Sequence, residues 1–160
     1  MWDIGIYSLN GARWFAGEEP TEISAVLRRP PGAQVKGRTA DVELGVDWQA
    51  RFPSGLVATC TSGYDHSANR IHVLGERGSA ELSPATSYEG NTLRVRAGGG
   101  ERTPSLGSSE EQFTGMLDEF ALAVRERRAP RTPGEMGLQD VRLMELIYEA
   151  ARQGRPVRAA

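Results

Sequence analysis

Apolar and polar residues alternate without a break over residues 42–52, which is the clearest pattern in the sequence. Successive side chains of a β-strand point to opposite faces, so a period of two predicts a strand with one buried and one polar face. Its apolar positions are Val42, Leu44, Val46, Trp48, Ala50 and Phe52. A Pro-Ser-Gly turn follows, so we expect residues 56–62 to return as the antiparallel partner in a hairpin. Residues 22–28 predict an earlier strand, which precedes a proline- and glycine-rich loop over residues 29–39.

The middle of the chain has the composition of further short strands. Residues 70–74 and 79–82 bracket a Gly-Glu-Arg-Gly turn and predict a second hairpin. Residues 92–96 add another short strand, and the three glycines at 98–100 predict a flexible polar connection. Because these strands follow one another with short turns, we expect antiparallel pairing.

Helical periods of apolar residues occur at both ends of the chain. Residues 3–15 predict a short amphipathic helix that Asp3 caps and Gly17 ends. From residue 111 an apolar stripe predicts a helix that faces the core. The stripe consists of Phe113, Met116, Leu117, Phe120 and Val124. A last helix is expected from about residue 137 to Arg152, with Gly154 and Pro156 just beyond its end.

The order of these elements predicts an α+β fold. We expect a predominantly antiparallel, open β-sheet with helices packed on one face, in a single domain spanning residues 1–160. Trp48 and Phe52 are large enough that we expect some apolar groups of the sheet to reach a second molecule. The sequence therefore predicts self-association through the sheet face.

Composition narrows the range of partners. The 160 residues include 19 basic and 21 acidic side chains, a formal net charge of −2, without a long run of one sign. This excludes the charge pattern of a protein that binds nucleic acid or an anionic membrane surface. Cys60 is the only cysteine, which fits a reducing, cytoplasmic location, and His66 and His72 lack the spacing of a metal site.

Asp3 and Tyr7 are the candidate chemical groups, because residues four apart on a helix share a face. A carboxylate beside a phenol could orient and protonate a substrate. A phenol has a reference pKa near ~10, so it needs a neighbouring cation or a proton relay to act at neutral pH, and no lysine lies nearby in the sequence. The alternative is that Asp3 only caps the helix and Tyr7 only packs its ring.

The same segment carries a family resemblance. Residues 3–14, Asp-Ile-Gly-Ile-Tyr-Ser-Leu-Asn-Gly-Ala-Arg-Trp, and the Gly-Glu-Glu-Pro at residues 17–20 resemble the opening of the C-terminal domain of glucose-fructose oxidoreductases, in the Gfo/Idh/MocA family. Further matches follow in order at residues 52–55, 84–88, 133–137, 139–142 and 148–157. The resemblance thus covers nearly the whole chain and is weakest over residues 90–109.

The resemblance implies a role for three residues. Tyr7 matches the proton donor and acceptor at the reacting sugar hydroxyl, and Asp3 matches a hydrogen-bond acceptor for the substrate, so both are catalytic and substrate-binding candidates. Tyr88 matches a tyrosine that lines the substrate pocket. The implied reaction is hydride transfer between a sugar carbon and the nicotinamide of NAD(P).

The resemblance also implies a missing half. In the family, a glycine-rich fingerprint and the lysine of a Glu-Lys-Pro motif belong to an N-terminal Rossmann domain, and this sequence has neither. We therefore expect the chain alone to lack tight NAD(P) binding and activity, with no cofactor-binding or metal-binding residues of its own. The alternative is a free-standing, non-catalytic dimerisation or sugar-binding module of the same fold.

Overall fold

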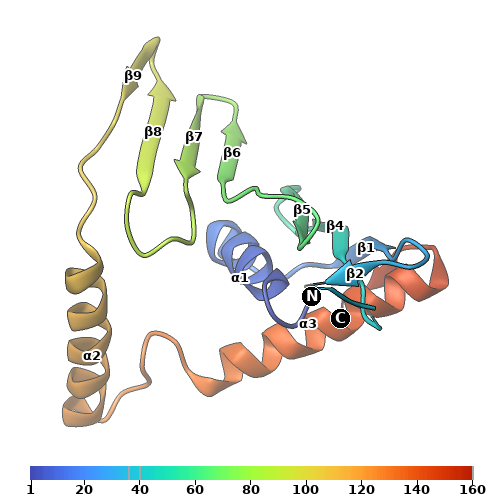
Figure 1. Ribbon diagram of the computed structural model, residues 1–160. Helices are drawn as coiled ribbons and strands as arrows, with labels where there is room; N and C mark the ends of the chain where they lie inside the picture. The colour runs from blue at the N-terminus through green and yellow to red at the C-terminus, as the bar shows by residue number, and fades with distance from the viewer. Residues whose placement is uncertain (36, 40, 160) are drawn as a thin grey trace. The chain divides into compact units, whose positions relative to one another are not determined.

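The computed structural model describes residues 1–35, 37–39 and 41–159, which form two compact units (Figure 1). Unit 1 consists of Met1–His66 and Gly134–Ala160, and unit 2 of Ser67–Pro133. Helices and antiparallel strands occur as the sequence predicts, and the α+β fold class is confirmed. The described helices include no apolar stretch long enough to cross a bilayer.

Unit 1 is built on a four-stranded antiparallel sheet with the order β10-β1-β4-β5. Its strands are β1 (Glu22–Arg28), β4 (Gly45–Arg51), β5 (Val57–Gly63) and β10 (Val157–Arg158). In this register Trp48 lies opposite Ala25 on one side and Cys60 on the other. The predicted strand at residues 22–28 and the predicted hairpin around the Pro-Ser-Gly turn are both confirmed. The short strand β10 was not predicted from the sequence.

Two helices cover one face of this sheet. Helix α1 (Gly5–Ala16) packs against β5, and α3 (Gly134–Gln153) packs against β1 and β10. The core between them is formed by apolar side chains that are almost fully buried. They include Leu9, Ile23, Val46, Trp48, Ala50, Phe52, Leu143, Met144, Ile147 and Ala150. The indole N–H of Trp48 is buried there without a hydrogen-bond partner among the described residues.

The structure corrects the sequence analysis at the start of β4. Val42 was expected to be buried and Glu43 to be exposed, but Val42 is half exposed and Glu43 is 7% exposed. The strand begins only at residue 45, so the alternation does not hold before it, and the Glu43 carboxylate turns inward to buried hydrogen-bond donors. Trp48 and Phe52 fill the core of unit 1, so neither presents its ring to a second molecule.

The predicted loop over residues 29–39 also contains regular structure. Two short strands, β2 (Gln34–Val35) and β3 (Arg38–Thr39), pair with each other in a small antiparallel ribbon. Residue 36, within the predicted loop, lies outside the described residues.

Unit 2 contains a second antiparallel sheet with the order β6-β7-β8-β9, visible in Figure 1 as successive green and yellow arrows. The strands are β6 (Ile71–Gly75), β7 (Gly78–Ser83), β8 (Thr92–Ala97) and β9 (Gly100–Arg102). Gly98 and Gly99 have positive φ angles of 59° and 79° and form the turn between β8 and β9. The three glycines are therefore part of a hairpin. Glycine suits the turn because it adopts positive φ angles without steric cost.

Helix α2 (Ser109–Glu126) begins with a capping box, in which the Ser108 hydroxyl and the Glu111 carboxylate each accept a backbone N–H of the other residue. The prediction that this helix faces the core was wrong. Its five stripe residues are 46% to 65% exposed. Within unit 2 no described strand packs along the stripe. The prediction failed because amphipathic spacing determines which side of a helix is apolar but not whether another element covers that side.

Candidate functional site

The candidate site lies at the start of α1. The helix begins at Gly5, and the residue before it, Ile4, occupies the cap position with no side-chain cap. The prediction that Asp3 caps the helix was therefore wrong, because Asp3 lies one residue too early in the chain. Its carboxylate oxygen Oδ2 instead accepts a hydrogen bond from the hydroxyl of Tyr64.

Tyr7 lies on the first turn of α1 and is 57% exposed. Gly5 and Leu9 are the buried residues of this helix. Tyr7 lies two positions from each of them, a rotation of about 200° around the helix axis, so its side chain points away from the core. The hydroxyl of Ser8 holds the helix on the sheet, since it donates to the Gly5 carbonyl at 2.8 Å and lies 3.1 Å from the Ser62 hydroxyl. Tyr7 thus projects outward from a fixed helix.

The structure places Asp3 and Tyr7 next to the same helix start, but it records no hydrogen bond between them. Asp3 is paired instead with Tyr64, which was not among the residues predicted for the site. Tyr64 directly follows β5, and its position next to Asp3 depends on the tertiary fold. No local sequence pattern connects two residues that are 61 positions apart.

A buried carboxylate lies beneath this region. Glu43 accepts hydrogen bonds from the Met1 ammonium at 2.5 Å and from the Tyr148 hydroxyl, and Tyr148 stacks on Trp2 with 6.1 Å between ring centroids. Burial would raise the pKa of Glu43, but these two donors outweigh it and leave the pKa lowered. Burial and the Glu43 carboxylate raise the pKa of Tyr148, so the phenol remains a donor.

Tyr88 belongs to unit 2 and is 68% exposed. Its ring contacts that of Phe113 with 5.7 Å between centroids. The loop before it is held by Asn69, whose side-chain oxygen accepts the backbone N–H groups of Ala85 and Thr86, each at 2.9 Å. The loop therefore presents Tyr88 at the surface of unit 2.

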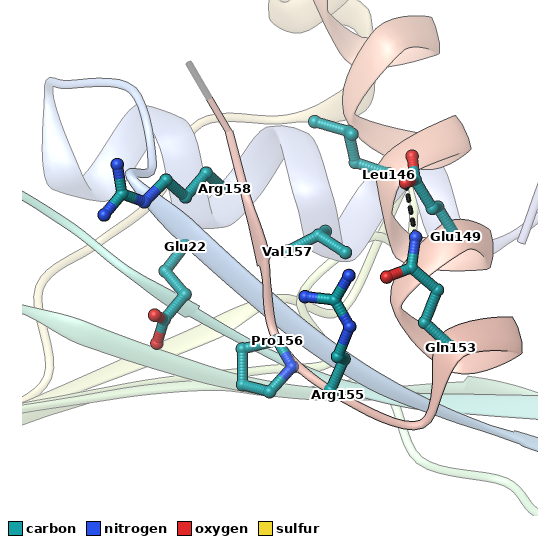
Figure 2. Close-up of a pocket in the computed structure, with 8 residues that line it drawn as sticks. All are labelled: Glu22, Leu146, Glu149, Gln153, Arg155, Pro156, Val157 and Arg158. Atoms are coloured by element: carbon teal, nitrogen blue, oxygen red, sulfur yellow. Dashed lines mark hydrogen bonds between the residues drawn. The ribbon is translucent and has the colours of Figure 1, made fainter.

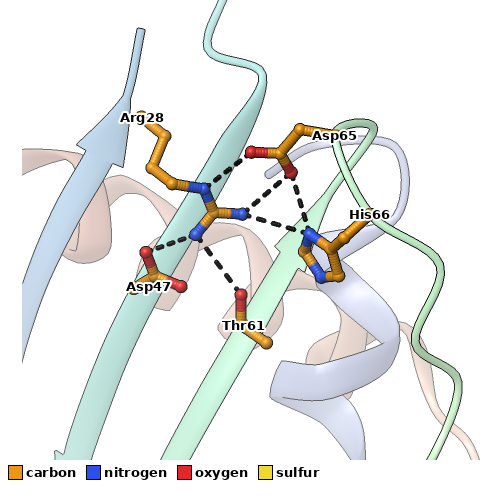
Figure 3. Close-up of polar contacts among 5 residues, drawn as sticks. All are labelled: Arg28, Asp47, Thr61, Asp65 and His66. Carbon is orange, nitrogen blue, oxygen red and sulfur yellow. Dashed lines mark hydrogen bonds and ion pairs between the residues drawn. The ribbon is translucent and has the colours of Figure 1, made fainter.

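A cluster of charged and polar side chains is centred on Arg28 and includes Asp65 and His66, the two residues that follow Tyr64 (Figure 3). The Arg28 guanidinium forms two hydrogen bonds with Asp65, at 2.9 and 3.1 Å, and a third with Asp47. Arg28 also lies 3.4 Å from the Thr61 hydroxyl, and Asp65 is 2.8 Å from the ring nitrogen Nδ1 of His66. Hydrogen bonds with Asp65 and Asp47 raise the pKa of Arg28, and the guanidinium lowers the pKa of both carboxyl groups.

Two glycines make room for this guanidinium. Arg28, Gly45 and Gly63 lie opposite one another on β1, β4 and β5. A Cβ atom on Gly45 would lie 2.1 Å from an Arg28 nitrogen, and one on Gly63 would lie 2.8 Å from it. The Arg28 side chain can therefore cross the sheet only because both neighbours lack side chains. His72, by contrast, is simply an exposed residue of β6.

Unit 1 also has two surface hollows that Asp3 and Tyr7 do not line. One, of about 410 Å³, lies between the end of α3 and β10, and Figure 2 shows Glu149 and Gln153 joined by a 2.6 Å hydrogen bond on its wall. The other, of about 470 Å³, lies on the outer face of the sheet beside Asp47, Gln49 and Thr59. Among the described residues, no group of three His, Cys, Asp or Glu side chains could hold a metal ion.

An open antiparallel sheet covered by helices on one face, with an exposed tyrosine and a carboxylate near the start of the first helix, makes unit 1 an α+β domain with a candidate site at its surface. A sequence model described as "Oxidoreductase family, C-terminal alpha/beta domain" matches residues 1–158. The chain belongs to this family, the Gfo/Idh/MocA oxidoreductases, and the resemblance found in the sequence is confirmed.

Several known proteins are similar to the chain over nearly its whole length. The crystal structure of an aldose-aldose oxidoreductase from Caulobacter crescentus, complexed with glycerol, is 39% identical with a TM-score of 0.87, and the match covers 98% of this chain and 46% of that one. D-xylose 1-dehydrogenase [NADP(+)] from Haloarcula marismortui is 30% identical over 98% of this chain and 42% of its own length. A levoglucosan dehydrogenase in complex with NADH and L-sorbose shares the fold, with a TM-score of 0.80 at 19% identity, over 99% of this chain and 49% of that one. The chain thus spans about half the length of these relatives.

Proposed function

We propose that this chain is the substrate-binding half of an NAD(P)-dependent oxidoreductase that acts on a sugar or related polyol by hydride transfer. The observation that carries the proposal is the exposed pair of Asp3 and Tyr7 at the start of a helix that is fixed to the sheet. Relatives named for activity on aldoses and D-xylose support a sugar as the substrate class.

The proposed roles follow from the chemistry of the side chains. The Tyr7 hydroxyl would take or give a proton at the reacting hydroxyl of the sugar. The Asp3 carboxylate would accept a hydrogen bond from another sugar hydroxyl and so orient the substrate. By the family resemblance, Tyr88 is proposed as a further substrate-binding residue, since a tyrosine offers a sugar both an aromatic ring and a hydroxyl donor.

The residues of this chain do not fit a dinucleotide. The sequence contains no Gly-x-Gly-x-x-Gly segment, and the three glycines at residues 98–100 belong to the hairpin of β8 and β9. NAD(P) would supply the hydride carrier in the whole protein, held by a nucleotide-binding half. We therefore expect the 160-residue chain by itself neither to bind NAD(P) tightly nor to oxidise sugars.

A chimera tests this proposal. The chain would replace the matching C-terminal half of the aldose-aldose oxidoreductase, and formation of reduced nicotinamide would be followed by absorbance with D-xylose or D-glucose. We expect turnover that Tyr7→Phe reduces by about 100-fold or more, since general acid–base catalysis contributes on the order of 10²–10⁴. A folded chimera whose activity survives Tyr7→Phe would contradict the role of Tyr7.

Calorimetry tests the complementary expectation. The chain alone would be titrated with NADH and NADPH, and we expect no binding in the micromolar range. Micromolar binding would mean that the chain holds a nucleotide site of its own. It would contradict the proposal that NAD(P) is held by a separate nucleotide-binding half.

We also propose that the outer face of the sheet in unit 1 mediates self-association. Val26 and Val57 on that face are 64% and 50% exposed. Uncharged polar residues such as Ser24, Gln49 and Thr59 lie between them, and the charged Asp47 and Arg51 lie opposite Val26 and Val57. Sedimentation velocity over a range of concentrations would show a dimer or larger species, and Val26→Arg would shift it towards monomer. A monomer at all concentrations would contradict the proposal.

A further inference from the structure

The Tyr64 hydroxyl determines how the Asp3 carboxylate is presented. It donates a hydrogen bond to Oδ2 of Asp3, whereas Oδ1 receives none from the residues that the structure describes. A carboxylate oxygen can accept more than one hydrogen bond, and a donor fixed on one oxygen restricts the rotation of the group. Asp3 is exposed, so Oδ1 is available to a ligand.

The backbone on both sides of Tyr64 is held in place. The N–H of Tyr64 donates to the carbonyl of Leu44 at 2.8 Å, one residue beyond the paired region of β4 and β5. The next residue, Asp65, is bound through two hydrogen bonds by Arg28. The residue before it is Gly63, where a Cβ atom would lie 2.9 Å from the Leu44 carbonyl. The charged cluster of Figure 3 thus anchors the segment that carries Tyr64.

The charges around Tyr64 keep its phenol protonated. The hydrogen bond to Asp3, partial burial and the nearby carboxylates of Asp3 and Glu43 all raise the pKa of Tyr64. A phenol whose pKa is raised above its ordinary value remains a hydrogen-bond donor throughout the neutral range. Tyr64 can therefore serve as a donor to Asp3 but not as a base towards a substrate.

We propose that Tyr64 is a positioning residue, whose hydroxyl holds Oδ2 of Asp3 so that Oδ1 accepts a hydroxyl group of the sugar. The proposal rests on the substrate-binding role proposed for Asp3. It assigns Tyr64 no contact with the reacting atoms. Its effect on the substrate passes through the carboxylate alone.

The first test concerns the contact itself and is independent of any substrate. The four tyrosines of the chain would be titrated with alkali by ultraviolet absorbance in the unaltered protein, Asp3→Asn, Tyr64→Phe and the double variant. We expect Asp3→Asn to lower the pKa of one phenol, because the acceptor carboxylate is removed. In the Tyr64→Phe background, Asp3→Asn should leave the titration unchanged. If Asp3→Asn has no effect, or has the same effect without Tyr64, the proposal is overturned.

The second test measures D-xylose binding by NMR shifts of the labelled chain in the same four proteins. We expect Tyr64→Phe to weaken binding about tenfold, which corresponds to about 1.4 kcal/mol and lies near the lower end for a hydrogen bond to a charged group. If Tyr64 acts only through Asp3, the double variant should bind no more weakly than Asp3→Asn. Tyr148→Phe is the matched control, because it removes a phenol hydroxyl from a different carboxylate, Glu43, and should leave binding unchanged.

The possible outcomes separate this inference from the proposed function. If D-xylose binds and Asp3→Asn weakens binding but Tyr64→Phe does not, Tyr64 has no positioning role while the proposed function stands. If Tyr64→Phe weakens binding further in the Asp3→Asn background, Tyr64 contacts the sugar itself and the inference is wrong. If the unaltered chain shows no D-xylose shifts, the proposed substrate role of Asp3 fails and this role fails with it, while the alkali titration still reports whether the contact exists.

Discussion

Removing one partner of the buried ion pair between Arg13 and Asp140 should be one of the more destabilising single changes in unit 1. Arg13 of α1 donates to the Asp140 carboxylate of α3 and to Glu19, while Asn10 donates to the other Asp140 oxygen at 3.0 Å. The side chains of Arg13 and Asp140 are only 9% and 5% exposed, whereas that of Glu19 is 51% exposed. Burial tends to lower the pKa of Arg13, but its two carboxylate partners outweigh this and raise it.

We expect Asp140→Ala to lower the free energy of unfolding by about 3 kcal/mol. Removing one partner of a buried pair costs on the order of 3–5 kcal/mol, because a charge is left buried without compensation. The lower end applies here, since Arg13 keeps Glu19. The matched variant Glu19→Ala removes the exposed partner of the same guanidinium and should cost less than about 1 kcal/mol.

Urea unfolding followed by tryptophan fluorescence checks this prediction. Trp2, Trp14 and Trp48 all lie in unit 1, so the signal reports on that unit alone. With a slope of about 1.5 kcal/mol per molar urea, a loss of about 3 kcal/mol moves the midpoint by about 2 M. Replacing both partners, in Arg13→Met with Asp140→Leu, should cost less than Asp140→Ala alone because no buried charge remains. Equal midpoints for Asp140→Ala and Glu19→Ala would refute the reasoning.

Four further outcomes are expected within unit 1. On α3, Ile147→Ala should lower the free energy of unfolding by about 2–5 kcal/mol because the side chain is fully buried. The control Val141→Ala, on the exposed side of the same helix, should cost under about 1 kcal/mol. Similar urea midpoints for the two variants would contradict the assignment of Ile147 to the core. Burial raises the pKa of Cys60 to about 12, so only about 10⁻⁴ of this thiol is ionised at pH 8, and a thiol reagent should label it far more slowly in the folded than in the urea-unfolded chain. The pKa of Cys60 is higher in the folded chain than in the unfolded chain, where it is about 9. The free energy of unfolding should therefore fall as the pH rises from about 9 towards 12, and Cys60→Ala should remove this part of its pH dependence. Gly17→Ala should cost about 1 kcal/mol, since φ at this helix end is +67° and nothing crowds the added methyl group, and an unchanged thermal midpoint would contradict this.

The sequence by itself determined the local elements and the family. The period of two over residues 45–52 and the helical period of α3 identify the strand and helix that form most of the core, because burial on one face of a regular element is encoded by spacing alone. The order of motifs along the chain identified the family, which the comparison with known proteins confirmed. The spacing of four residues and the family resemblance together made Asp3 and Tyr7 candidate site residues.

Tertiary structure decided which of these faces and groups meet. Spacing made the stripe of α2 apolar, but only packing determines whether another element covers it, and the described elements of unit 2 do not. The period of two predicts an exposed position for Glu43, yet its carboxylate is buried because Tyr148, 105 residues away in the chain, supplies a hydrogen-bond donor. In the same way Asp3 was expected to cap its own helix and is bound by Tyr64 instead, since hydrogen-bond partners brought together by folding outweigh the local preference of a side chain for its neighbouring backbone.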